Sequence, residues 1–114
     1  MWLSRIQAPP WPDAIVSRTV ELADDLSEER VYDMAVEYGL RSFPEDSVVR
    51  GHGMRWKYGR GELADALALA RTFSDEDGCP EVRRQLDLWL REVDASDQRA
   101  QIRETAESLA CVHP

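Results

Sequence analysis

The side chains best suited to covalent or acid–base chemistry are two cysteines, two histidines and several loop carboxylates. Either Cys79 or Cys111 could pair with His52 or His113 as a thiol and its base. Cys79 precedes Pro80 at a turn, and Cys111 lies close to the end of the sequence. Neither setting is typical of an activated nucleophile, so we expect no catalytic residues. A small enzyme that uses His52 and a loop carboxylate is the weakest of three functional hypotheses.

Metal-ligating residue types are present, but not at the spacing that metal sites use. The cysteines and histidines form no C-x-x-C pair and no closely spaced histidine pair. The turn Asp75-Glu76-Asp77-Gly78 resembles the start of a calcium loop, but Cys79 and Val82 stand where ligands would be needed. The sequence therefore predicts no metal and no cofactor.

Residues 50–60 form the most distinctive charge feature of the chain. They carry a net charge of +4 without an acidic residue, whereas residues 1–49 and residues 61–114 each carry −6. Cations beside aromatic rings and glycines can hold a phosphate, a nucleic-acid strand or an acidic protein surface. The alternative is that the cations pair with carboxylates of the same chain while the rings pack inward. With the two N-terminal tryptophans, which are of a type common at interface hot spots, the candidate partner-binding residues are Arg50, His52, Arg55, Trp56, Lys57, Tyr58, Arg60, Trp2 and Trp11.

A second candidate surface is acidic. Between residues 21 and 37 the carboxylates are opposed by a single cation, Arg30. Like charges three or four residues apart on a helix repel by a few tenths of a kcal/mol per pair, which a basic partner would offset. An ordinary solvated helix face is the alternative. The residues of this acidic surface are Glu21, Asp24, Asp25, Glu28, Glu29 and Asp33.

The elements that position these residues are predicted to be mainly α-helical, in one domain over residues 1–114. Apolar residues recur at helical spacing and predict a bundle of four to five helices. We expect helices at about 12–25 and 28–38, a third from residue 62, and either one long bent helix or two helices over residues 80–110. Trp89 falls on the apolar stripe of the last region and is expected in the core.

Two segments depart from the helical period. Phe43-Pro44 and three glycines interrupt residues 41–60, with a fourth at Gly61, and Met54, Trp56 and Tyr58 alternate with polar residues. This pattern favours a short β-hairpin or an irregular loop inserted at about 41–60. Pro9, Pro10 and Pro12 predict an extended arm over residues 1–11, whose apolar side chains should lie against the body or a partner.

The bulk composition narrows the location and the class of partner. A net charge of −8 opposes non-specific binding to nucleic-acid phosphates or anionic lipid. No apolar run is long enough to cross a membrane, and the first residues do not resemble a signal peptide. We therefore expect a cytoplasmic protein with reduced thiols and no membrane partner. One lysine among fourteen basic residues and the absence of asparagine favour a gene from a high-GC bacterium or its phage.

The hypothesis that follows is a small acidic non-enzymatic binding protein that acts by occupying a macromolecular partner. Inhibitors, immunity proteins, antitoxins and phage-encoded defence blockers act in this way, and the expected partner is a protein. The alternative is a nucleic-acid or phosphate-ligand binding module that uses the basic aromatic segment 50–60.

Overall fold

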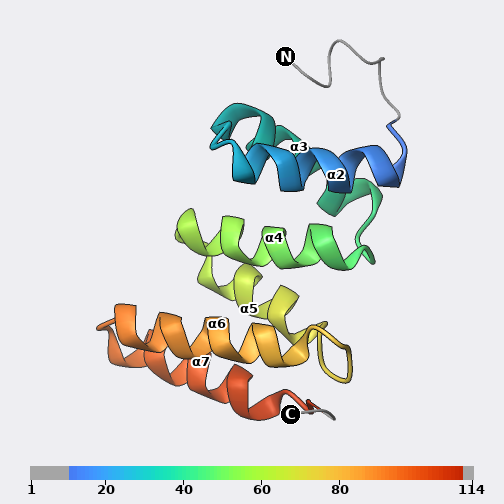
Figure 1. Cartoon of the computed structure of the whole chain (residues 1–114). Helices are drawn as coiled ribbons and strands as arrows, with labels where there is room; N and C mark the ends of the chain where they lie inside the picture. The colour runs from blue at the N-terminus through green and yellow to red at the C-terminus, as the bar shows by residue number, and fades with distance from the viewer. Residues whose placement is uncertain (1–10, 112–114) are drawn as a thin grey trace. The chain divides into compact units, whose positions relative to one another are not determined.

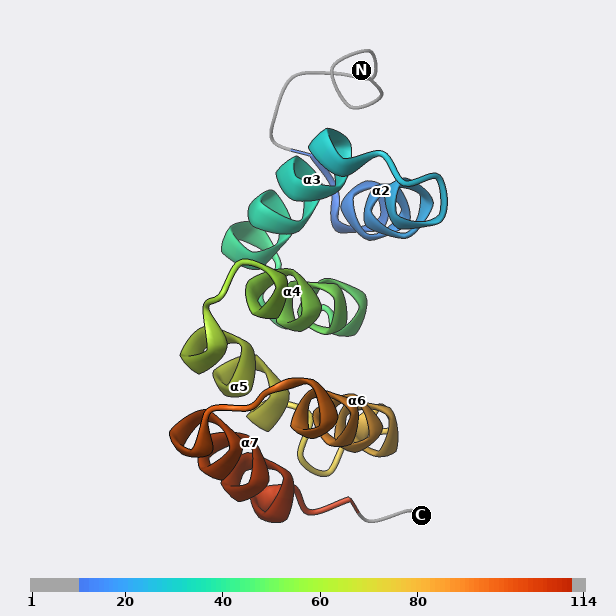
Figure 2. The same ribbon diagram turned by 90° about the vertical axis from the view of Figure 1, so that its left-hand side faces the viewer.

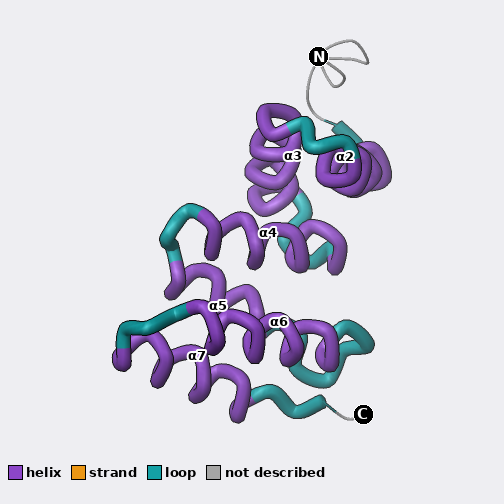
Figure 3. The backbone as a smooth tube through the Cα atoms, turned by 60° about the vertical axis from the view of Figure 1, so that its left-hand side comes forward, coloured by secondary structure: helices purple, strands orange, loops and turns teal. Residues whose placement is uncertain are grey.

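The computed structural model describes residues 11–111, and these residues form six helices and no strand (Figures 1 and 3). The mainly α fold is thereby confirmed, but the predicted number of four to five helices is too low, because residues 41–60 add a helix. The chain divides into two compact units, Met1–Trp56 and Lys57–Pro114, and the boundary falls inside one helix. The organisation as a single domain stays a prediction, and the extended arm lies outside the described residues except for Trp11.

The first unit is built on a helical hairpin of α2, Asp13–Asp25, and α3, Glu29–Ser42, which pack side by side. The turn between them is closed by the amide of Glu28, which donates to the carbonyl of Ala23 at 2.9 Å. Ser27 adopts the left-handed conformation at φ 57°, as the residue after a helix end often does. The buried residues that join the two helices are Val16, Thr19, Val20 and Ala23 of α2 and Val31, Ala35, Val36 and Gly39 of α3.

Helix α4, Ser47–Gly59, occupies the stretch for which the sequence predicts a hairpin or loop, so that prediction is wrong. The Asp46 carboxylate accepts hydrogen bonds from the amides of Val48 and Val49, at 2.8 and 3.1 Å, which caps the helix start. Gly53 serves packing rather than a turn, because a Cβ there would lie 2.8 Å from Leu40 Cδ2 of α3. Gly53 therefore marks the close approach of two helices.

The second unit contains α5, Leu63–Arg71, α6, Cys79–Glu92, and α7, Ser96–Ser108. Helices α6 and α7 pack against each other (Figure 2). Trp89 is only 2% exposed, which confirms its predicted place in the core. Residues 80–110 form two helices, because Val93 and Ala95 adopt extended backbone between them. Arg99 donates to the carbonyls of Leu90 and Val93 and so satisfies the end of α6.

A disulfide joins Cys79, at the start of α6, to Cys111, in the segment after α7. The prediction of reduced thiols is therefore wrong. The two cysteines are 32 residues apart in sequence, but α6 and α7 bring their Cα atoms to 5.4 Å, within the range that a disulfide requires. The hydrogen bond from the Asp75 amide to the Ala110 carbonyl, at 3.2 Å, holds the same two segments together.

Within residues 11–111, none of the helices combines the length and the apolar character needed to cross a membrane. A cytoplasmic location stays a prediction.

Candidate functional site

Most of the basic segment that lies in the first unit is buried or partly buried against that unit, whereas Arg55 is exposed. Arg50 is only 7% exposed. The indole Nε1 of Trp56 donates to Asp33 Oδ1 of α3 at 2.9 Å, and the Trp56 ring is partly buried against the core of the unit. Two residues of different candidate surfaces, Trp56 and Asp33, are thus brought together by α3 and α4.

His52 and Arg55 form a hydrogen-bonded group with Tyr32 of α3. The His52 Nδ1 atom lies 3.0 Å from Arg55 Nη2 and 3.0 Å from Tyr32 Oη. A guanidinium can only donate, so Nδ1 is an acceptor and the imidazole is neutral with its proton on Nε2. Burial, and next the charge of Arg55, lower the pKa of His52, while burial raises the pKa of Tyr32. This group holds α4 against α3.

The rest of the basic segment contacts residues of the second unit. Lys57 Nζ lies 3.4 Å from Glu62 Oε2 and 3.8 Å from Asp65 Oδ2, and Arg60 Nε lies 3.6 Å from the same Glu62 oxygen. Tyr58 stacks on Trp89 with ring centroids 4.0 Å apart and planes nearly parallel, at 2°. Its hydroxyl donates to Glu92 at 3.2 Å; burial, and next this hydrogen bond, raise the pKa of Tyr58.

The described contacts of residues 50–60 therefore agree with the alternative in which the cations pair within the chain and the rings pack inward. Helix α4 replaces the loop or hairpin expected here, and the described cations and rings of the segment contact residues of their own unit. A partner-binding role for these residues stays a prediction. Trp2 lies outside the described residues.

The acidic surface of the first unit is exposed at all six of its residues. Four of them, Asp24, Asp25, Glu28 and Glu29, flank the turn between α2 and α3, and within residues 11–111 none of the six forms an ion pair. Leu26 lies in the same turn with 68% of its surface exposed. The tip of the helical hairpin is thus negatively charged around one exposed apolar side chain.

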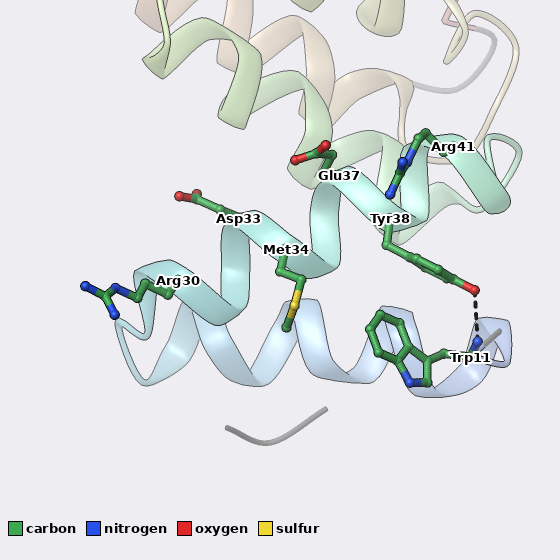
Figure 4. Close-up of a pocket in the computed structure, with 7 residues that line it drawn as sticks. All are labelled: Trp11, Arg30, Asp33, Met34, Glu37, Tyr38 and Arg41. Carbon is green, nitrogen blue, oxygen red and sulfur yellow. Dashed lines mark hydrogen bonds between the residues drawn. The ribbon is translucent and has the colours of Figure 1, made fainter. Parts of the chain in front are cut away.

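A groove of about 680 Å³ runs along α3 in the first unit (Figure 4). Six of its lining residues belong to α3. Each of them has another three or four positions away, so all six share one side of the helix. The lining residues are Trp11, Arg30, Asp33, Met34, Glu37, Tyr38 and Arg41. We call this the α3 groove.

The apolar part of the α3 groove is made by Trp11, Met34 and Tyr38. The rings of Trp11 and Tyr38 lie 4.7 Å apart between centroids and are tilted by 55°. The backbone amide of Trp11 donates to the Tyr38 hydroxyl at 2.9 Å, which fixes the phenol in place (Figure 4). Met34 is partly buried beside these rings. A fixed aromatic pair next to an adaptable methionine can receive an apolar side chain of a partner.

The charged part of the α3 groove has a defined order along the helix. Arg30 stands near its start and Arg41 near its end, with Asp33 and Glu37 between them, and all four side chains are exposed. Because α3 presents these four charges on one side, a ligand that binds along the groove meets a cation, two anions and a cation in turn.

The sequence indicates Trp11 as a candidate partner-binding residue and Asp33 as part of an acidic surface, but it does not place the two in one site. Met34 and Tyr38 recur at helical spacing with Val31 and Ala35, which is typical of a single buried stripe, yet both are only partly buried. One sequence signal could have shown that these two residues face a groove. Positions 30, 33, 34, 37, 38 and 41 share one side of the helix, and four of the six carry charged residues.

The described part of the chain contains no group of three or more histidine, cysteine, aspartate or glutamate side chains arranged to hold a metal ion. No protein-family model matches the chain, and no curated protein or solved structure is detectably similar to it.

Proposed function

We propose that this protein is a small acidic non-enzymatic binding protein that occupies a protein partner through the α3 groove. Inhibitors, immunity proteins and antitoxins of bacteria and phages act by this kind of occupation. The observation that carries the proposal is the groove itself, in which an apolar aromatic floor is bordered by exposed charges of both signs on one helix.

The residue types in the groove are those that protein interfaces favour. Tryptophan, tyrosine, methionine and arginine are enriched at interfaces, and the first two and arginine are frequent hot spots. Trp11, Tyr38 and Met34 can form the desolvated centre, while the charged side chains form the rim. The α3 groove, of about 680 Å³, is open along the helix and can therefore accept part of a protein surface.

The charge around the groove indicates the character of the partner. Glu28 and Glu29 are exposed immediately before Arg30, and the whole chain carries −8. Such a field attracts a basic surface and speeds its association at low ionic strength. We infer that the partner presents an apolar anchor next to basic residues.

Affinity capture with groove variants tests this proposal. The tagged chain, Met34→Glu and Glu37→Arg are each used to capture proteins from the source cells, and Arg103→Glu, an exposed substitution on α7, is the matched control. We expect a protein that is retained by the unaltered chain and by Arg103→Glu but lost with both groove variants. Circular dichroism establishes that all the variants are folded.

Two results would contradict the proposal. A partner retained equally by both groove variants would place the binding surface elsewhere. The absence of any protein enriched over the bare resin, under conditions where the tagged chain is folded and accessible, would oppose a binding function for the chain.

A further inference from the structure

The charged side chains along the α3 groove have an order that is the same from both ends of the helix. From Arg30 to Arg41 the signs are positive, negative, negative and positive. All four side chains are exposed, and none takes part in the ion pairs found among residues 11–111. Asp33 accepts the indole N–H of Trp56, which is neutral and leaves the charge of the carboxylate in place. The groove thus presents a symmetric series of charges to its occupant.

This symmetry disfavours a second copy of the chain as the occupant. If two α3 helices lie side by side in the same direction and in register, each charge faces its own equivalent. If they run in opposite directions, Arg30 faces Arg41 of the second copy, and the two carboxylates of one copy face those of the other. Like charges meet in both arrangements, which costs free energy at an interface. The complementary occupant carries the inverse order of acid, base, base and acid.

The spacing of these charges fits a helix better than a strand. Positions 30, 33, 37 and 41 extend over about 16.5 Å of the α3 axis, at 1.5 Å per residue. A second helix along the groove repeats side chains at the same steps of three or four residues and stays in register. A strand places every second side chain on one face, about 6.7 Å apart, so three steps span about 20 Å. A strand would therefore misplace its last charge by about 3.5 Å.

The apolar floor gives the groove a direction that the charges do not. Figure 4 shows the two carboxylates on one side of α3, and Met34 with the Trp11 ring on the other side. Tyr38 lies about one turn before Arg41, so the aromatic pair is nearer that end of the groove. An apolar side chain beside the acid that meets Arg41 therefore reaches the aromatic pair.

We propose that the occupant of the α3 groove is an amphipathic helix of another protein, with two bases flanked by two acids on its contact face and an apolar anchor beside one acid. The bases meet the carboxylates, the acids meet Arg30 and Arg41, and the anchor packs on the aromatic pair. This inference rests on the proposed function, which requires a protein partner, and adds the conformation and the charge order of the bound segment.

Fluorescence anisotropy with two stapled helical peptides tests this charge order. Both peptides have about 16 residues, enough to span the groove, and the same composition with one leucine anchor. One carries acid, base, base and acid on its contact face, and the other carries base, acid, acid and base. We expect the unaltered chain to bind the first peptide about tenfold or more tightly, because four exposed charge pairs each change the affinity by about twofold. The preference should weaken as the salt concentration rises.

A matched control exchanges the charges of the groove without changing the net charge of the chain. It carries Arg30→Glu, Asp33→Arg, Glu37→Arg and Arg41→Glu, and it should prefer the second peptide. The smaller exchange of Glu37→Arg with Arg41→Glu keeps the hydrogen bond between Asp33 and Trp56. It leaves two attractive and two repulsive pairs with either peptide, so it should abolish the preference even where the larger exchange fails to fold.

Three outcomes would overturn the inference. Equal affinities of the two peptides for the unaltered chain, or the same preference in the exchanged chain, would remove the charge order. Binding of neither peptide would remove a helical occupant. Dimers of the unaltered chain in sedimentation, lost in both exchanged chains, would assign the groove to a second copy. Because these measurements use peptides and purified chain, the capture experiment with cell proteins succeeds or fails separately.

Discussion

Ser27 occupies a backbone position that favours glycine. Its φ of 57° lies in the left-handed region, where a side chain costs roughly 1–2 kcal/mol, and it follows the end of α2. We predict that Ser27→Gly raises the free energy of unfolding by roughly 0.5–1 kcal/mol, because the relief of strain exceeds the entropic cost of glycine.

Urea denaturation of Ser27→Gly and Ser17→Gly checks this prediction. Ser17 lies inside α2, so glycine there should lower the free energy of unfolding by about 0.5 kcal/mol. Losses of similar size at both positions would mean that Ser27 is not strained.

His52 makes the stability of the protein depend on pH. Burial, and next the charge of Arg55, lower its pKa, and these outweigh the opposite effect of the carboxylates that face it, Asp24, Glu21 and Asp25. The unfolded chain therefore binds a proton more readily than the folded chain. The contribution of His52 is complete above its ordinary pKa of 6.5 and is lost as the pH falls below that value toward the folded pKa.

We predict that the free energy of unfolding decreases between about pH 7.5 and about pH 5.5, and that it decreases less in His52→Gln. Nuclear magnetic resonance titration of the His52 ring should give a midpoint below 6.5. A midpoint at or above that value would contradict the proposed acceptor role of Nδ1.

At the scale of elements, the amphipathic helices could be predicted from sequence. The expected ranges 12–25 and 28–38 correspond to α2 and α3, and the strong apolar stripe around Trp89 corresponds to α6. Helix α4 could not be predicted, because glycine is frequent in turns as well as at close helix contacts. Only the position of Leu40 beside Gly53 shows which of these roles applies.

The candidate site was predictable only in part for a related reason. Trp11 and Asp33 could be chosen by residue type, but their place in one groove depends on how the chain enters α2 and on the packing of α3. The side of α3 that remains open is set by its neighbours, so the sequence pattern alone does not show that Met34 and Tyr38 line it.

The packing of α3 against α4 gives a further prediction. A Cβ on Gly39 would lie 2.9 Å from both γ carbons of Val49, whereas nothing lies within 4 Å of the corresponding position at Gly59. Because valine cannot easily move aside, we predict that Gly39→Ala lowers the free energy of unfolding by about 1–3 kcal/mol.

Gly59→Ala is the matched control, and it should leave the free energy of unfolding unchanged or raise it by up to about 1 kcal/mol. Denaturant titration of both variants measures the difference. Equal effects of the two substitutions would argue against a close contact between α3 and α4 at Gly39.

At the scale of the whole molecule, the disulfide between Cys79 and Cys111 is a covalent constraint, whereas the sequence analysis predicts reduced thiols. It closes a loop with a separation of 32 residues, for which the loss of chain entropy in the unfolded state corresponds to about 3–4 kcal/mol. Disulfides persist in oxidising compartments, so this bond bears directly on the predicted cytoplasmic location.

We predict that reduction, or the double substitution Cys79→Ser with Cys111→Ser, lowers the free energy of unfolding by about 3–4 kcal/mol. Thiol titration of the purified protein in denaturant should find no free thiol before reduction. Two reactive thiols in the protein as isolated from its own cells, with no stability change on adding reductant, would contradict the disulfide.

The proposed function places the partner in the α3 groove. Site-specific photo-crosslinking tests it directly: a photoreactive phenylalanine analogue replaces Glu37 in the groove or, as a control, Arg103 on α7, and the cells are irradiated. We predict a covalent adduct with one other protein at position 37 and none at position 103. An adduct at position 103 alone, or equal adducts at both positions, would contradict it.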